Sequence, residues 1–434
     1  MKEYILIIML IMLVFFNCAC SEYKEPEKAE GDVSSKQKNT ETNMDSLPRH
    51  EDTDSQNPIE GILSQMTLEE KVGQVFITAF RSNSSDKPMQ ELDNNARKVI
   101  SDYCLGGVVL FSENIHTIQQ TANLIKDMQM SSKIPLFIAV DEEGGIVSRL
   151  NSSDSMHATK LPGNMAVGRT QNPQLAYEVG RIIGREIGAL GFNIDFAPVA
   201  DVNTNPENPV IGDRSFGSDP DTVALMVEAM VKGIQDQNVS AVLKHFPGHG
   251  DTSFDTHTGE VVVEHGKDRL ETVEFVPFKK GIEAEVDGIM TAHIQVPKIT
   301  GNNIPATMSE EILTGILRDE LNFKGIIITD ALEMGAISKY WSSGEASVKA
   351  FKAGADILLM PASLSEAYNA LLEAVRQGEI SEERLDESVR RILTVKQRRS
   401  ILSSKDKGAN AEQILGNQEH IEIADRIKKE AKIN

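Results

Sequence analysis

The segment from Lys244 to His257 carries the residues of this chain whose types and spacing are most suited to chemistry. Three of the nine histidines and two aspartates fall within this short stretch: His245, His249, Asp251, Asp255 and His257. Proline and glycine interrupt it, and these residues mark loops. The segment is therefore predicted to be a loop that gathers imidazoles and carboxylates around one small volume. Such a set serves proton transfer, metal binding, or both.

Asp255 and His257 are separated by one residue. A carboxylate that accepts a hydrogen bond from one imidazole nitrogen leaves the other nitrogen for proton transfer. An ordinary histidine pKa of about 6.5 suits a group that acts first as an acid and then as a base. Asp330 follows the apolar run Ile326–Thr329, where a carboxylate is aimed rigidly and partly desolvated. It suits a nucleophile that attacks a sugar's anomeric carbon, and it would equally cap the next helix.

Further charged residues lie in glycine-bounded segments. Asp141 and Arg149 flank Gly144 and Gly145, and Arg214 lies between Gly212 and Gly217. Carboxylates and guanidinium groups are natural partners for sugar hydroxyls, but these residues could also pair with one another for structure. Lys244 adds a donor next to His245.

Eight apolar runs alternate with stretches of helical spacing, which predicts parallel strands buried on both faces. This pattern favours one (β/α)8 barrel of the TIM type over an open doubly wound sheet, since no GxGxxG follows the first run. Asp141, Lys244–His245, His293 and Asp330 end or follow four of these runs. Residues at the carboxyl ends of barrel strands form the active site. The predicted strands are Val72–Phe80, Gly107–Phe111, Leu136–Val140, Phe192–Val199, Ala241–Lys244, Gly288–Thr291, Gly325–Thr329 and Asp356–Met360.

The ends of the chain differ from this pattern. Ile5–Phe16 is an apolar run too short to span a bilayer comfortably, and Cys20 follows a small residue, as in a bacterial lipoprotein signal. Cys18 is the less favoured lipidation site. We expect a signal at 1–20, a disordered polar tether at 21–58, the barrel at 59–403 and a helical tail at 404–434. The protein would then be lipid-anchored on the extracytoplasmic face of the bacterial membrane, or shed from it.

The 434 residues are 40% hydrophobic and 25% charged, as in a globular protein, and the net charge is -21. That charge argues against nucleic acid as a partner, because phosphates would be repelled. It equally disfavours an electrostatic hold on anionic lipid.

Five motifs in order resemble the family 3 glycoside hydrolases, in the bacterial β-N-acetylglucosaminidase branch. The resemblance covers about Met66 to Arg399, and it implies a (β/α)8 barrel. Many surface-anchored relatives continue into a second α/β domain, and His420–Asn434 resembles the start of its first helix. The usual glutamine or histidine after the first aspartate is Glu142 here. The motifs are Asp141–Arg149, Leu161–Met165, Asn208–Asp219, Lys244–His257 and Thr329–Met334.

The resemblance implies a role for each matching residue. Asp330 would be the nucleophile and His257 the acid/base, oriented by Asp255. The expected activity is retaining, exo-acting release of N-acetylglucosamine from β-linked saccharides or muropeptides, by a monomer without cofactor or metal. The residues expected to bind the terminal sugar are Asp141, Arg149, Arg214, Lys244 and His245.

Three other functions remain open from the sequence. The same residues could serve a phosphorylase, because a neutral imidazole does not repel phosphate. A metal-dependent hydrolase would use His245, His249, Asp251 and His257, although their spacing matches no common zinc signature. A lipoprotein that only binds sugars would show tight binding without turnover.

Overall fold

The computed structural model describes residues 58–257, 259–403 and 410–432. The predicted signal segment, Cys20 and nearly all of the predicted tether lie outside these residues. Within the described ranges, no helix combines the length and the apolar character needed to cross a bilayer.

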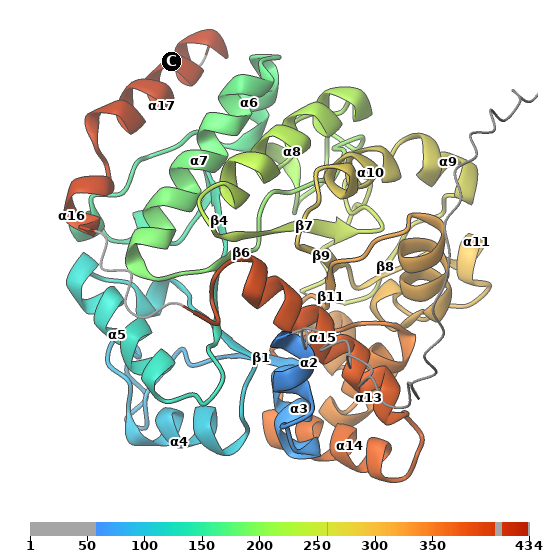
Figure 1. The fold of residues 1–434 in the computed structure, drawn as a ribbon. Helices are drawn as coiled ribbons and strands as arrows, with labels where there is room; N and C mark the ends of the chain where they lie inside the picture. Colours follow the sequence, from blue (N-terminus) through green and yellow to red (C-terminus); the bar gives the residue numbers. More distant parts are fainter. Residues whose placement is uncertain (1–57, 258, 404–409, 433–434) are drawn as a thin grey trace, which may run out of the picture. The chain divides into compact units, whose positions relative to one another are not determined.

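Eight parallel strands form the central sheet, in the order in which they follow along the chain (Figure 1). A further parallel bridge between Ile328 and Ile357 joins the two ends of the sheet, so the strands continue around a ring. The predicted (β/α)8 barrel is therefore confirmed. The strands are β1 (Phe76–Ala79), β2 (Gly107–Val109), β3 (Phe137–Val140), β6 (Ile194–Asp195), β7 (Ser240–Phe246), β9 (Gly288–Thr291), β11 (Ile326–Ile328) and β12 (Leu358–Leu359).

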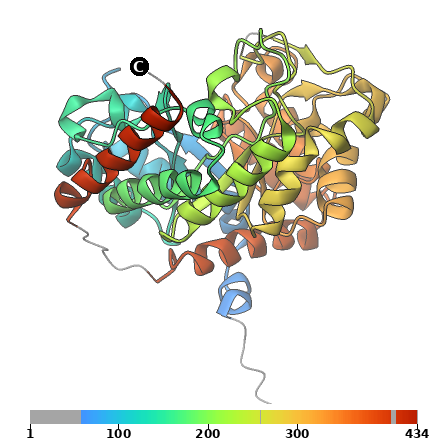
Figure 2. The same cartoon turned by 90° about the horizontal axis from the view of Figure 1, so that it is seen from above.

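Helices lie outside the strands, as Figures 1 and 2 show. The strands are apolar on both faces because side chains fill the ring inside and helices cover it outside. These helices are α3 (Leu68–Gln74), α4 (Asn94–Asp102), α5 (Ile118–Met130), α6 (Asn164–Arg169), α7 (Pro173–Leu190), α8 (Pro220–Gln235), α9 (Lys267–Thr272), α10 (Phe275–Glu283), α11 (Pro297–Thr300), a π-helix (Glu311–Glu320), α12 (Gly335–Ser338), α13 (Ser343–Ala353) and α14 (Leu364–Arg376).

Two details of the predicted elements are wrong. The first predicted strand begins too early, because Val72 lies in α3, which starts at a capping box formed by Thr67 and Glu70. The segment from Lys244 is not a loop throughout, because β7 continues to Phe246 and the loop begins only at Pro247. Lys244 and His245 therefore sit on the rigid barrel wall rather than on a loop.

Helix α15 (Glu382–Arg398) lies over the amino-terminal ends of the strands, together with α2 (Pro58–Leu63) (Figure 1). Its charged residues reach carboxylates that directly precede strands: Arg391 contacts Asp356 at 3.0 Å and Arg398 contacts Asp287 at 3.1 Å. Two further helices, α16 (Ala411–Ile414) and α17 (Gln418–Glu430), pack beside α7. The carboxyl-terminal mouth of the barrel is thus left for the loops that follow each strand.

Candidate active site

Buried charges at the carboxyl ends of β3 and β7 form one connected network. Lys244 places its Nζ 2.7 Å from Oδ1 of Asp141 and 2.6 Å from Oε1 of Glu143. Arg214 donates two hydrogen bonds to Glu143, at 2.9 and 2.8 Å. Burial raises the pKa of Glu143, but Lys244 and Arg214 outweigh it and lower the pKa to about 2. Glu143 is thus a charged, fixed link between the two cations.

The exposed fractions of the side chains show which residues of this network a ligand could reach. The side chains of Glu143 and Lys244 are only 1% and 2% exposed, whereas those of Asp141 and Arg149 are 18% and 27% exposed. Arg149 lies 3.5 Å from Asp141, and its buried Nε has no hydrogen-bond partner among the described residues. Asp141 and Arg149 are therefore the groups best placed to bind hydroxyls in the mouth.

A hairpin holds Arg149 in place. Strands β4 (Glu142–Gly144) and β5 (Val147–Ser148) pair antiparallel, with Arg149 directly after β5. At the turn, Gly145 has a φ of +58°, and a Cβ there would lie 2.6 Å from Cα of Gly163. Glycine meets both demands, because it tolerates positive φ and has no side chain to collide. The hairpin thus packs directly against the motif Leu161–Met165, and the small residue Gly163 of this motif permits the close contact with Gly145.

Asp330 lies just beyond β11, half-buried and aimed by a hydrogen bond of 2.8 Å from the backbone N–H of Ala331 to its Oδ1. Burial raises the pKa of this carboxyl, but His293, His245, the Ala331 amide and Lys244 together leave it lowered. Asp330 is therefore a fixed carboxylate that is ionised at neutral pH.

The imidazole rings of His245 and His293 are held by different groups. His245 contacts Asp201 at 2.7 Å, and Asp201 also accepts from the backbone N–H of His249 at 2.7 Å. His293 lies between Oγ1 of Thr307 at 2.8 Å and the carbonyl oxygen of Ala331 at 3.0 Å. Burial is the main cause that lowers the pKa of His293.

The predicted pair of Asp255 and His257 is present in the loop that follows β7. Nδ1 of His257 lies 2.7 Å from Oδ1 of Asp255, and the imidazole is 67% exposed. Asp330 and His257 both act electrostatically on His293. The carbonyl oxygen of His257 also accepts a hydrogen bond from the backbone N–H of Gly335, five residues after Asp330, so the loop places this accessible imidazole beside the segment that carries Asp330.

The four residues of the metal alternative do not converge. Asp251 accepts from Thr204 at 2.6 Å and contacts His265 at 2.5 Å, whereas His249 contacts Thr252 at 2.7 Å. His245 and His257 face their own aspartates. Within the described ranges, no group of three or more histidine, cysteine, aspartate or glutamate side chains is arranged to hold a metal ion.

Sequence reasoning did not assign Glu143 or Asp201, and it named His293 only as a strand end. Asp201 follows the apolar run Phe192–Val199 and could have been found by the signal that marked Asp330. Glu143 gave no such signal, because three consecutive acidic residues do not reveal which of them turns inward.

Glu142 is a buried carboxyl that supports the Arg149 hairpin. Its Oε2 accepts from the backbone N–H groups of Arg149 and Leu150, at 2.9 and 3.0 Å. Burial raises its pKa from 4.5 to about 7. Since the unfolded chain loses this proton first, the contribution of Glu142 to stability is present below pH 4.5 and is lost as the pH rises towards 7.

We expect Glu142→Gln to stabilise the fold at pH 8 and to change it little at pH 4.5. Each pKa unit corresponds to about 1.4 kcal/mol, so the expected gain at pH 8 is roughly 3 kcal/mol. Urea unfolding of both proteins at the two pH values measures it. A gain of equal size at both pH values would contradict the assigned cause.

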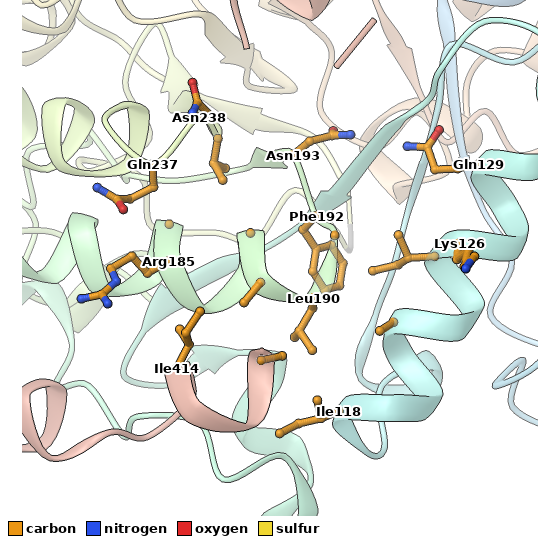
Figure 3. A pocket seen from close by; sticks show the side chains of 18 of the residues that line it. Ile118, Lys126, Gln129, Arg185, Leu190, Phe192, Asn193, Gln237, Asn238 and Ile414 are labelled. Carbon is orange, nitrogen blue, oxygen red and sulfur yellow. The ribbon is translucent and has the colours of Figure 1, made fainter. Parts of the chain in front are cut away.

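A cavity of about 1110 Å³ lies apart from this site (Figure 3). It is lined by the segments before β3, β6 and β7, including Phe192, Asn193 and Asn238, and hence lies towards the amino-terminal ends of the strands. None of the predicted site residues lines it. Ile401 and Asn410 also line it.

A closed (β/α)8 barrel with oriented carboxylates, cations and imidazoles at the carboxyl ends of its strands has the architecture of a barrel enzyme. Residues 67–395 match the glycosyl hydrolase family 3 N terminal domain, and the chain belongs to this family.

Three relatives show how far the similarity extends. Beta-hexosaminidase A of Pseudoalteromonas piscicida is 38% identical over 82% of this chain and 65% of its own length. Beta-hexosaminidase LpqI of Mycobacterium tuberculosis is 35% identical over 77% of this chain and 84% of its own. The structure of a glycoside hydrolase family 3 beta-N-acetylglucosaminidase from Paenibacillus sp. str. FPU-7 has a TM-score of 0.79 at 41% identity, covering 84% of this chain and 69% of that one. The chain thus spans about two thirds of the length of the first relative.

Proposed function

We propose that this protein is a retaining β-N-acetylglucosaminidase that releases terminal N-acetylglucosamine from β-linked glycosides. The observation that carries the proposal is the setting of Asp330. It is a carboxylate fixed just beyond β11 by the Ala331 amide, and the charges of His293, His245 and Lys244 help to lower its pKa. The names of the relatives support the choice of sugar.

The mechanism has two steps. In the first, Asp330 attacks the anomeric carbon while Nε2 of His257 donates its proton to the departing glycosidic oxygen, and a covalent glycosyl-enzyme forms. In the second, His257 removes a proton from water, which attacks the same carbon and frees Asp330. Asp255 holds the tautomer of His257 through Nδ1.

The terminal sugar lies against the charged network in this proposal. Asp141 and Arg149, the more exposed groups of the network, bind its hydroxyls directly, and Lys244 and His245 contribute from β7. Arg214 acts mainly through Glu143, because three of its donor contacts go to Glu143 and to the carbonyl oxygen of Val210.

We further propose peptidoglycan fragments as the substrate and the extracytoplasmic membrane face as the location. The location rests on the amino-terminal sequence, in which Cys20 follows the apolar run Ile5–Phe16. The substrate rests on the family resemblance together with that location. Labelling of cells with a lipid precursor tests the anchor: a Cys20→Ser protein should take up no label, whereas a Cys18→Ser protein should.

The activity is tested by the initial rate on an aryl β-N-acetylglucosaminide, with excess EDTA and without phosphate. We expect turnover that EDTA does not reduce. A rate that depends on added phosphate would favour the phosphorylase, and binding without turnover in every buffer would favour a sugar-binding lipoprotein.

We expect His257→Ala to reduce hydrolysis of a disaccharide glycoside by roughly 10²–10⁴-fold, because its leaving oxygen needs a proton. The kcat/KM for a dinitrophenyl glycoside should fall much less, since that leaving group departs without a proton and kcat/KM reports only the steps up to formation of the glycosyl-enzyme. The comparison of the two rates is the measurement. His265→Ala is a matched control, because His265 also forms an imidazole–aspartate contact, with Asp251, and has no proposed catalytic role. Equal losses on both substrates would contradict the role of His257.

A further inference from the structure

The loop that carries His257 is attached to the chain segment that carries Asp330. The backbone N–H of Gly335 donates to the carbonyl oxygen of His257 at 3.3 Å, and that of Ala336 donates to Thr256 at 3.1 Å. Both donors belong to the first turn of α12, which begins five residues after Asp330. First-turn N–H groups have no partner within their own helix. Here the carbonyl groups of the loop supply the missing partners.

This attachment needs glycine at position 335. A Cβ there would lie 2.6 Å from the carbonyl oxygen of His257, closer than such atoms approach. The φ of Gly335 is not positive, so the backbone conformation itself would accept another residue. A side chain at position 335 is therefore excluded by the lack of space between α12 and the His257 loop, not by the backbone conformation.

From these contacts we propose that Gly335 is a positioning residue, whose missing side chain lets the His257 loop dock on α12 and sets the reach of the acid/base. The proposal rests on the catalytic role proposed above for His257. Asp255 lies on the same loop as His257, so their pairing fixes the ring only relative to that loop. The docking on α12 relates the loop to Asp330.

Other contacts support the loop from its inner side. Thr256 is buried, and its Oγ1 lies 3.4 Å from Nε2 of His249. The backbone N–H of His249 in turn donates to Asp201, which faces His245 on β7. Thr256 and His257 are thus held between the wall of the barrel and α12. A shift at the α12 side would displace His257 while leaving β7 and Asp330 in place.

The test is Gly335→Ala, with Gly259→Ala as the matched control. Gly259 lies two residues from His257, and a Cβ there would meet no atom of the described residues within 4 Å. A misplacement of about 1 Å can cost a catalytic group roughly 10²-fold. We therefore expect Gly335→Ala to reduce kcat/KM for a disaccharide glycoside by roughly 10–100-fold, while kcat/KM for a dinitrophenyl glycoside, which reports formation of the glycosyl-enzyme without need of an acid, stays within about threefold. Gly259→Ala should match the wild type on both substrates.

Equal losses on both substrates, or no loss on either, would overturn the proposal. A second measurement needs no variant. Hydrogen exchange of the wild-type protein should show slow exchange at the Gly335 and Ala336 amides, and rapid exchange there would also overturn it. If the wild-type protein hydrolyses neither glycoside, the proposed function has failed, and hydrogen exchange still tests the docking separately.

Discussion

Asp330→Ala will lower kcat for glycoside hydrolysis by roughly 10⁴-fold or more, since removal of a nucleophile abolishes the covalent route. The effect should be this large because Asp330 is held ionised and aimed by the Ala331 amide and the neighbouring imidazoles. Steady-state kinetics on an aryl glycoside measures the loss. Added azide should partly restore turnover, because it can occupy the vacated space, attack the anomeric carbon and yield a glycosyl azide of inverted configuration.

Glu333 supplies a control from the same segment. Its carboxylate lies 3.5 Å from Arg81, and both side chains are 45% exposed. Exposed pairs of this kind contribute little, so Glu333→Gln should keep kcat within about twofold. A residual rate of Asp330→Ala close to that of the wild type, with no azide product, would remove Asp330 from the role of nucleophile.

Glu143→Gln will destabilise the protein by about 3–5 kcal/mol, because it leaves Lys244 and Arg214 as buried charges without their common partner. Sugar binding should weaken as well, since Lys244 and Arg214 are fixed by Glu143. Urea unfolding measures the first effect, and KM for an aryl N-acetylglucosaminide measures the second.

The exposed pair of Glu69 and Arg376 is the matched control for Glu143→Gln. Their charged atoms lie 2.8 Å apart, the same distance as between Arg214 and Glu143, but both side chains are about half exposed. Glu69→Gln should therefore cost less than about 1 kcal/mol. Equal costs for the two substitutions would show that burial does not set the strength of the Glu143 network.

Protonation of Glu143 should also set the pH at which the protein loses stability in acid. The pKa of Glu143 is lowered from 4.5 to about 2 in the folded protein. Its stabilising contribution is therefore fully present above pH 4.5 and is lost as the pH falls towards 2. Between these values, the stability of the wild-type protein should approach that of Glu143→Gln.

The positions of the strands could be predicted because barrel strands are buried on both faces and thus form continuous apolar runs. The first run was extended too far, since the capping signal of Thr67 and Glu70 belongs to α3. The same periodicity located Asp141, His293 and Asp330, because a strand end in a parallel barrel is also the edge of the mouth. The roles of Asp330, His257 and Asp255 stay predictions until the variants above are measured.

The sequence by itself determined the barrel and its family, because periodicity and ordered motifs are local properties of the chain. The pairing of Asp255 with His257 is local for the same reason. Only the tertiary structure decided that Glu143 joins Lys244 to Arg214, that Asp201 faces His245, and that the His257 loop rests on Gly335. These contacts join residues that are distant in the sequence, and such proximity depends on how the strands close into a ring rather than on the pattern within any one segment.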